Sequence, residues 1–584
     1  MSPPARSEPT GDVSSCLEDS ASRSHRPRLR TVQGVATRIS AKRVASHALS
    51  HLLKLPPPTT DFTVVRGVRV PMRDGVNLIA HHYAPQTAAP AGTLLVRCPY
   101  GRAFPFSTLF GAVYGARGYH VVIQSVRGTF GSGGEFTPMI HEVADGADTV
   151  AWLRNQAWFT GSFATIGLSY LGFTQWALLM DPPPEMAAAI ISVGPHDFSK
   201  SAWGTGSFTI NDFLGWSDMM SRQEEANRLL GALQQGRSRR RVARATREVP
   251  MGGAGRTMLG AGAPWWESWA EHPDREDPFW TPLRLTEALD RVDVPVLLFS
   301  GWQDLFLDQT LTQFQHLHGR EVTTALTVGP WTHTELMTKG ARIVIRESLS
   351  WLDAHLGGKP DSARSTVRAY VNNGDWLDLP TWPPAMAEHV LYLQPAHRLS
   401  TEPPDDSASP STFTFDPTDP TPTIGGRLLS PEGGYRDDTA LAMRPDVVDF
   451  TGDPLTVDLY VIGSPVIELS HACDNPDNDV FVRLSEVDAD GRSTNVSEGL
   501  VRLTTDSDVV RLELDAVAHR FPAGSRLRVM VAGGSHPRFM RNLGTGEPPI
   551  SGTEMKPANH AVHHGAGGLS RLVLPAGAQT PSAD

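Results

Sequence analysis

The apolar residues of this chain follow two different patterns. In the first half, short runs are continuously apolar, and each is followed by a turn or a helical stretch. These runs are "TLLVRCPYG" (93–101), "YHVVIQSVRG" (119–128), "FATIGLS" (163–169), "AAAIISVGP" (187–195), "VPVLLFSGW" (294–302) and "TALTVGPW" (324–331). Strands that are apolar on both faces are typical of a parallel sheet covered by helices. The first half therefore predicts an α/β fold.

Two segments fit beside this sheet and one interrupts it. The stretch "FTVVRGVRVPMRDGVNLIAHHYAP" consists of two β-rich runs around a turn, which predicts a hairpin, and residues 141–156 resemble a covering helix. Between Pro195 and about Glu287 only helix-like segments occur, among them the basic run "RSRRRVARATR" (237–247). We interpret this insertion as a helical cap over the strand ends, with the basic run on a solvated face.

After residue 358 the pattern changes to alternation of apolar and polar residues, as in "PLTVDLYVIG" and "SRLRVMVAG". Such alternation predicts an antiparallel β-sandwich in which each sheet has one solvent-exposed face. The expected domains are an α/β domain at 59–197 and 286–360, a cap at 198–285, a β-sandwich at 361–576 and a tail at 577–584.

The first 58 residues differ from the rest: residues 1–34 are rich in Ser, Pro and Arg, and eight basic but no acidic residues lie between Ala21 and Lys54. We expect a disordered basic tail with one docking helix, rather than a membrane-surface or targeting element. The apolar face of that helix would consist of Val44, Ala45, Ala48, Leu49, Leu52 and Leu53.

The composition narrows the function classes. With 40% hydrophobic and 20% charged residues the chain resembles a soluble globular protein, and its net charge of -11 argues against nucleic-acid binding. No apolar run is long enough for a membrane span. Three cysteines (Cys16, Cys98 and Cys473) make no disulfide framework or metal cluster, so we expect a cytoplasmic protein without a metal. The sequence does not decide whether the protein forms a homodimer.

Residues 163–180, "FATIGLSYLGFTQWALLM", are typical of a strand, a tight turn and a helix, with Ser169 in the turn. The usual nucleophile pattern in such a turn is G-x-S-x-G. Gly167 stands two residues before the serine, but the second glycine, Gly172, comes one residue late. The serine is therefore a candidate nucleophile whose partners have to come from elsewhere in the chain.

A serine needs a base to take its proton and a third group to orient that base. In an α/β-hydrolase sheet the acid and then the histidine follow the serine, each just past a later strand. Asp304 follows "VPVLLFSGWQ" and His333 follows "TALTVGPWT". Asp308 is the rival acid, but the turn directly after the strand is better placed. The oxyanion would be bound by the backbone N–H of Tyr170 and the phenol of Tyr100.

The strings "GLSYLGFTQW", "RCPYGR", "GWQDLF" and "VGPWTH" resemble the CocE/NonD hydrolases, the family of cocaine esterase and the X-Pro dipeptidyl-peptidases. The elbow of that family is G-x-S-Y-x-G, which accounts for the late glycine. The resemblance runs from about Phe62 to Leu574 and implies an α/β-hydrolase domain with a helical cap and a C-terminal jelly-roll domain that helps to wall the site. It implies that Ser169 is the nucleophile, His333 the base, Asp304 its orienter, and Tyr100 with Tyr170 the oxyanion hole. No cofactor is then needed.

The resemblance also suggests a substrate pocket. Trp203, Trp216 and Phe306 match positions that hold an aromatic acyl group in the cocaine-esterase-like branch, although both tryptophans also suit a cap core. The amino-ester hydrolases hold an ammonium group with carboxylates, two of which would fall where this chain has Phe306 and Leu307. We therefore expect an apolar slot without a carboxylate.

These observations predict a serine esterase that acts on small-molecule esters, and also on amides, through an acyl-enzyme. The alternative within the family is an X-Pro dipeptidyl-peptidase, whose amine-binding residues have no short motif to look for. A different class of function is an inactive hydrolase fold that serves as a binding module. The presence of all five expected catalytic positions favours an active enzyme.

Overall fold

The computed structural model describes residues 41–224, 231–359, 364–503, 509–565 and 568–581. The expected disordered segment before Ala41 lies outside these residues. Within them, α1 (Ala41–Leu52) is the expected N-terminal helix. Its end is attached to the following domain, because the Arg117 guanidinium donates to Ser50 Oγ at 2.8 Å and also to the carbonyl of Pro56. No helix among the described residues has the length and apolar character to cross a bilayer.

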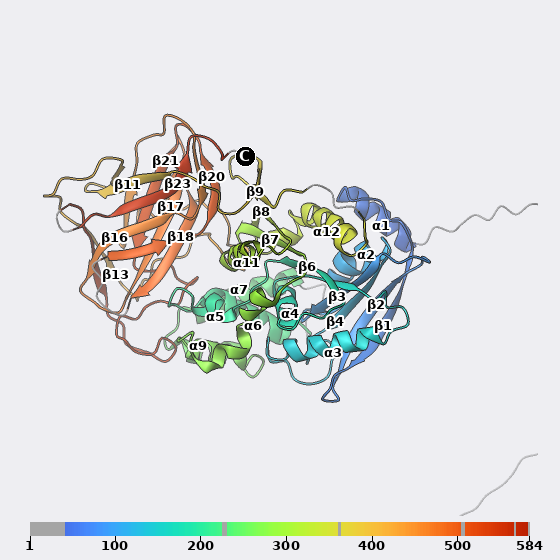
Figure 1. Ribbon diagram of the computed structural model, residues 1–584. Coiled ribbons are helices and arrows are strands. Elements are labelled where there is room, and N and C mark those ends of the chain that lie inside the picture. Colours follow the sequence, from blue (N-terminus) through green and yellow to red (C-terminus); the bar gives the residue numbers. More distant parts are fainter. Residues whose placement is uncertain (1–40, 225–230, 360–363, 504–508, 566–567, 582–584) are drawn as a thin grey trace, which may run out of the picture. The chain divides into compact units, whose positions relative to one another are not determined.

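The first half of the chain forms a mixed sheet, in the order β1-β2-β4-β3-β5-β6-β7-β8-β9-β10 (Figure 1). The strands from β4 to β9 are parallel, and β1, β2 and β10 are antiparallel to their neighbours. The α/β prediction is thus confirmed. The strands are β1 (Phe62–Pro71), β2 (Asn77–Pro85), β3 (Gly92–Cys98), β4 (Tyr119–Ser125), β5 (Phe163–Leu168), β6 (Met186–Ser192), β7 (Val296–Gln303), β8 (Thr324–Thr332), β9 (Val367–Tyr370) and β10 (Trp376–Leu379).

Helices cover both faces of this sheet. Apolar residues of α3 (Glu142–Arg154), α4 (Tyr170–Leu178) and α11 (Leu307–Gly319) pack in one core with the sheet and the cap. On the other face, residues of α2 (Val113–Gly115) and α12 (Ala341–His355) pack in a second core, and a π-helix (Ser107–Ala112) and a 3-10 helix (Glu335–Met337) flank them. Because both faces are covered, the central strands are buried along their whole length, as their apolar runs predict.

The described residues between β6 and β7 form the helical insertion. Its elements are α5 (Phe198–Trp203), α6 (Ile210–Arg222), α7 (Gly231–Ala245), α8 (Met251–Leu259), α9 (Trp265–Glu271), a 3-10 helix (Pro278–Leu283) and α10 (Glu287–Arg291). The basic run lies on α7, where Arg241 binds Asp218 of α6 at 2.6 Å and Arg239 binds Glu432 at 2.7 Å.

The C-terminal part is a β-sandwich. Its strands are β11 (Glu388–Gln394), β12 (Arg398–Ser400), β13 (Ser411–Phe415), β14 (Val447–Thr451), β15 (Leu459–Gly463), β16 (Val466–Cys473), β17 (Asn478–Val487), β18 (Ser493–Leu503), β19 (Val509–Glu513), β20 (Val517–Phe521), β21 (Arg526–Ala532), β22 (Ala558–Val562) and β23 (Arg571–Gly577). With the exception of the β12–β14 bridge, their pairings are antiparallel among the described residues. Their inward side chains form a separate apolar core.

Two strands after the expected domain boundary at residue 361 still pair with the first sheet. β9 pairs with β8 in parallel and β10 pairs with β9, so the first sheet continues to Leu379. Buried and partly exposed residues alternate in the sequence "VRAY" of β9, because this strand lies near the edge of the sheet and one of its faces is more exposed to solvent. That alternation is the pattern of a sandwich strand, and the sequence alone cannot separate the two cases.

Candidate active site

Ser169 lies in a sharp turn between β5 and α4. Its backbone has φ 58° and ψ −124°, a left-handed region that a non-glycine residue adopts only under strain. Such strain is common at functional positions, because the surrounding structure has to enforce it. The side chain is half-buried.

Two glycines make this turn sterically feasible. A Cβ on Gly167 would come within 2.5 Å of Leu171 Cβ. A Cβ on Gly172 would come within 2.5 Å of Gly194 Cα, in the loop after β6. The late second glycine is therefore explained by packing, since it is at Gly172 that α4 passes closest to the neighbouring strand's loop.

His333 and Asp304 form a buried pair at the carboxyl ends of neighbouring strands. His333 Nδ1 lies 2.6 Å from Asp304 Oδ1, and the side chains are 5% and 0% exposed. Asp304 Oδ2 accepts hydrogen bonds from Ser300 Oγ and the backbone N–H of Phe306, each at 3.1 Å. An ionised carboxylate can only accept, so His333 carries its proton on Nδ1 and keeps Nε2 available as a base.

The rival acid Asp308 lies elsewhere. Its Oδ1 is 2.6 Å from Arg427 Nη1, a guanidinium that also lies 3.0 Å from Asp515. The Asp308 side chain is 58% exposed, whereas the Asp304 side chain is fully buried and contacts His333. The structure thus brings Asp304, and not Asp308, to His333.

Tyr100 follows β3 and its phenol contacts both the serine and the cap. The phenol oxygen accepts a hydrogen bond from Trp216 Nε1 at 3.1 Å and is also hydrogen-bonded to Ser169. Burial raises the pKa of Tyr100 to about 12, although these two hydrogen bonds oppose the shift. The phenol therefore keeps its proton at neutral pH and can donate it to an oxygen that becomes negatively charged.

Tyr170 is the first residue of α4, and its side chain points away from the serine. Its hydroxyl donates to Glu142 Oε1 at 2.8 Å and accepts from the backbone N–H of Met139 at 2.7 Å. Only the backbone N–H of Tyr170 is then left for an oxyanion, as the sequence predicts.

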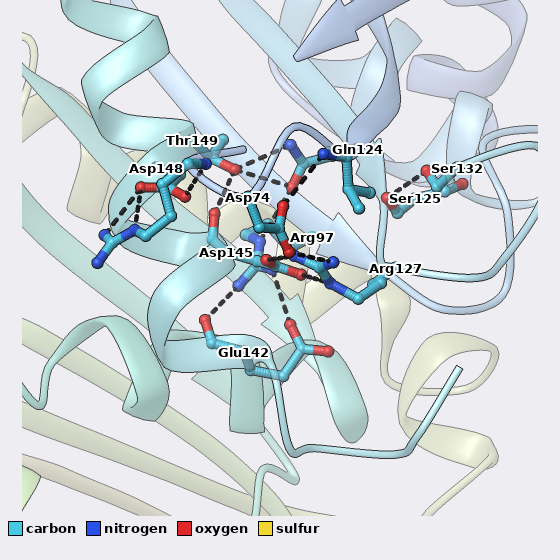
Figure 2. A network of polar contacts seen from close by, with 12 residues as sticks. Asp74, Arg97, Gln124, Ser125, Arg127, Ser132, Glu142, Asp145, Asp148 and Thr149 are labelled. Atoms are coloured by element: carbon cyan, nitrogen blue, oxygen red, sulfur yellow. Dashed lines mark hydrogen bonds and ion pairs between the residues drawn. The ribbon is translucent and has the colours of Figure 1, made fainter. Parts of the chain in front are cut away.

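Glu142 belongs to a buried polar network that Figure 2 shows between α3 and the sheet. Its Oε2 lies 2.8 Å from Arg97 Nη2, and Arg97 Nε donates to Gln124 Oε1 at 3.0 Å. Burial raises the pKa of Glu142, and the charge of Arg97 opposes this shift. The network fixes the start of α4 relative to β3 and β4, and thereby the position of the N–H of Tyr170.

The three expected pocket residues are not equivalent. The Trp216 ring stacks on Tyr170 at a centroid distance of 6.2 Å, and the edge of Phe306 meets the His333 ring at 5.5 Å. Trp203, in contrast, donates from Nε1 to the carbonyl of Trp269 at 2.8 Å and is 1% exposed. Trp203 therefore belongs to the cap core, as its place at the end of a short amphipathic helix allows.

One residue near the site has no signal in the sequence. Asp212 lies on α6, one helical turn before Trp216, and is 1% exposed. Burial raises the pKa of Asp212 to about 6, with the attraction of Arg538 and His333 opposing the shift. The expectation of an apolar slot without a carboxylate stays a prediction. Among the described residues, no three His, Cys, Asp or Glu side chains gather as a set of metal ligands.

A loop of the sandwich borders this region. The backbone N–H of Leu429 donates to Asp212 Oδ1 at 3.0 Å, and Arg427 binds Asp308. Tyr435 is hydrogen-bonded to Gln303, the residue before Asp304. The loop therefore contacts both the cap and the β7–α11 turn that carries the acid.

Comparison with known proteins places this geometry in a family. Residues 74–335 match the model described as X-Pro dipeptidyl-peptidase (S15 family), and residues 362–573 match its C-terminal non-catalytic domain. The cocaine esterase of Rhodococcus sp. (strain MB1 Bresler) is 30% identical over 573 residues, which are 88% of this chain and 99% of the esterase. The chain belongs to the S15 family of serine hydrolases.

Solved structures agree with this assignment at the level of the fold. An α-amino acid ester hydrolase superposes on the S15 hydrolase with a TM-score of 0.76 at 23% identity, over 89% of this chain and 97% of that one. A CocE/NonD family hydrolase from Staphylococcus aureus has a TM-score of 0.65 at 18% identity, over 88% and 94%. The predicted resemblance is confirmed, and the S15 hydrolase is an enzyme with esterase or peptidase activity.

Proposed function

We propose that this S15 hydrolase cleaves carboxylic esters through an acyl-enzyme on Ser169. His333 Nε2 takes the hydroxyl proton while Ser169 Oγ attacks the ester carbonyl. Asp304 keeps the imidazole in the required tautomer and stabilises the imidazolium that forms. The observation that carries this proposal is the buried 2.6 Å bond between His333 Nδ1 and Asp304 Oδ1, at the carboxyl ends of β7 and β8 in the same parallel sheet whose strand β5 precedes Ser169.

The two tyrosines act on the intermediate in different ways. As the carbonyl oxygen becomes an oxyanion, it accepts hydrogen bonds from the phenol O–H of Tyr100 and the backbone N–H of Tyr170. The intermediate then collapses, the leaving alcohol takes the proton from His333, and the acyl group stays on Ser169. A water molecule next loses its proton to His333 and attacks the acyl carbonyl. The second collapse releases the acid and returns the proton to Ser169 Oγ.

We further propose an aryl or similarly bulky apolar acyl group. Trp216 lies against the phenol of Tyr100, and Phe306 lies against His333, so two aromatic rings flank the reacting centre. Aromatic walls favour apolar groups, whose burial is the main source of affinity in such pockets. The name of the Rhodococcus relative, cocaine esterase, supports an ester substrate. Amides are slower substrates because their nitrogen is a poorer leaving group.

The alternative is an X-Pro dipeptidyl-peptidase, which the description of the matching family model favours. The two functions can be separated by kcat/KM on phenyl benzoate and on Gly-Pro p-nitroanilide, with Ser169→Ala as the blank. We expect the ester to be cleaved and the anilide to be cleaved poorly. Efficient anilide cleavage with negligible esterase activity would overturn the proposal in favour of the peptidase.

The catalytic assignment has its own test, which does not depend on the substrate. A fluorophosphonate probe should label the native enzyme on Ser169 and leave Ser169→Ala unlabelled. Labelling at a different serine, or equal labelling of the variant, would contradict the assignment of the nucleophile.

A further inference from the structure

The catalytic sheet is irregular directly before the proposed acid and base. β7 and β8 run in register up to Gly301 and Gly329, but the next paired residues are Gln303 and Thr332, so β8 contains one extra residue at this point. A Cβ on Gly301 would lie 2.1 Å from the carbonyl oxygen of Trp331 within this bulge, so glycine is required at the close approach. A bulge of this kind interrupts the regular ladder of hydrogen bonds between two strands.

The proposed catalytic pair follows this irregular pair without any spacer. Gln303 directly precedes Asp304, and Thr332 directly precedes His333. The sheet therefore supports the two strand ends less than a regular ladder would, although they carry the 2.6 Å bond between His333 Nδ1 and Asp304 Oδ1. A contact from another part of the molecule can stabilise the alignment of this bond.

A loop of the sandwich provides such a contact. The hydroxyl of Tyr435 is hydrogen-bonded to the side chain of Gln303. A Cβ on Gly434 would lie 3.1 Å from Thr332 Cγ2, so the backbone of the loop passes close to Thr332. The Tyr435 hydroxyl also accepts a hydrogen bond from Asn372 Nδ2, in the turn between β9 and β10. Two neighbouring loop residues thus approach both members of the irregular pair.

The loop is itself fixed by the sandwich. Gly434 is paired with Gly426 through two backbone hydrogen bonds of 2.8 and 2.9 Å. Asn495 of β18 is 2% exposed. Its Nδ2 donates to the carbonyl of Gly434 at 3.2 Å, and its Oδ1 accepts from the backbone N–H of Arg436 at 2.6 Å. Tyr435 therefore lies between two residues that are anchored on the sandwich.

From these contacts we infer that Tyr435 is a positioning residue, which acts through Gln303 and keeps the Asp304 carboxylate aligned with the imidazole of the base. This inference rests on the catalytic roles proposed above for Asp304 and His333. Because burial raises the pKa of Tyr435, its hydroxyl keeps its proton at neutral pH and brings no charge to the site. The sandwich domain then contributes to the reaction by fixing the acid.

Single variants test whether the hydrogen bond affects turnover. Tyr435→Phe keeps the ring and removes the hydroxyl, so kcat on phenyl benzoate should fall roughly 3- to 10-fold, as expected for one hydrogen bond. KM should change less than about twofold, because the contacts of the substrate are kept. Gln303→Met removes the same bond from its other side and should give a similar loss. Glu432→Gln is the matched control, because Glu432 lies in the same loop but binds Arg239 of the cap at 2.7 Å. It should leave kcat unchanged.

A double-mutant cycle separates positioning from a purely structural role. The quantity measured is the rate at which a fluorophosphonate labels Ser169. Asp304→Asn has no carboxylate to align, so the addition of Tyr435→Phe should slow its labelling less than about 1.5-fold, whereas Tyr435→Phe alone should slow the native enzyme roughly 3- to 10-fold. Equal slowing in both backgrounds would show that Tyr435 supports only the fold, and the inference would fail.

The pH dependence of kcat/KM is a second readout that a purely structural role would not change. Its acid limb reports the protonation of the base in the free enzyme. A poorly aligned carboxylate stabilises the imidazolium less, so the acid limb of Tyr435→Phe should move to lower pH, by roughly half a unit. A slower reaction with an unchanged acid limb would contradict the inference.

The labelling rates also distinguish failure of this inference from failure of the catalytic assignment. If the native enzyme is not labelled on Ser169, or if Asp304→Asn is labelled as fast as the native enzyme, the assignment fails and the inference fails with it. If Asp304→Asn is labelled slowly and Tyr435→Phe at the native rate, only the inference is overturned. Labelling does not depend on the preferred substrate, so the test holds for an esterase and for a peptidase.

Discussion

The indole N–H of Trp216 donates to the phenol oxygen of Tyr100 at 3.1 Å, and this bond joins the helical cap to the catalytic sheet. It occupies a lone pair of the phenol oxygen and leaves the O–H free to point at the neighbouring Ser169. A residue of the cap thereby orients a group that we place in the oxyanion hole. In the mechanism that we propose, the cap therefore positions a catalytic group.

The first prediction concerns this phenol. Tyr100→Phe removes the O–H and little volume, so the fold should be kept while kcat falls by roughly 10²–10³, the usual loss for one oxyanion donor. Trp216→Phe keeps an aromatic wall and removes only the orienting N–H, so its effect on kcat should be smaller, about 3- to 10-fold. Steady-state kinetics on phenyl benzoate measures both. An unchanged rate in Tyr100→Phe would remove Tyr100 from the hole.

Tyr170→Phe should behave in the opposite way, because the hydroxyl of Tyr170 is structural. Its removal leaves Glu142 Oε1 and the N–H of Met139 without their partner, which should cost about 1–3 kcal/mol of unfolding free energy. The backbone N–H is untouched, so kcat should change little. Thermal unfolding and kinetics on the same ester measure the two effects. A large loss of kcat with an unchanged melting temperature would mean that the phenol itself takes part in the reaction.

Much of the candidate site can be derived from the sequence, because each proposed catalytic residue directly follows an apolar strand. The strand runs locate Ser169, Asp304 and His333, and the order of the strands brings their ends together. Even the displaced Gly172 has a local cause, its close approach to Gly194. These features depend on short segments and on one general property of parallel sheets.

The remaining features depend on contacts between distant segments. Both Trp203 and Trp216 lie in helix-like segments of the cap, and only the packing of the cap places one in the core and the other on Tyr100. Asp212 resembles an ordinary exposed aspartate of an amphipathic helix. Its burial results from the approach of Leu429, more than two hundred residues further along the chain, in a loop that has no strand or helix pattern of its own.

The reaction should not require a metal ion. The proposed residues supply the nucleophile, the base and the oxyanion donors, so prolonged dialysis against EDTA should leave kcat unchanged. Loss of activity on dialysis that a defined divalent ion restores would contradict this prediction. Melting temperatures before and after dialysis control for a purely structural ion.

The last prediction concerns stability and follows from the two buried aspartates of α6. Burial raises the pKa of Asp212 from 3.8 to about 6, which means that the folded state binds this proton more tightly than the unfolded chain does. Its ionisation therefore opposes folding, and the cost appears as the pH rises from about 4 to above 6. For a shift of this size the full cost is about 3 kcal/mol.

Asp212→Asn cannot ionise and should be free of this cost. Relative to the native enzyme, the variant should gain stability between pH 4.5 and pH 7.5, by up to about 3 kcal/mol.

Asp218→Asn should behave in the opposite sense. Although burial raises the pKa of Asp218, its hydrogen bonds with Ser238, Arg241 and Arg222 outweigh burial and keep this pKa below the usual value. The asparagine there should be destabilising at neutral pH, and less so in acid. Melting temperatures of the three proteins across this pH range measure both slopes. Parallel curves for Asp212→Asn and the native enzyme would show that the Asp212 carboxylate carries no uncompensated charge in the folded state.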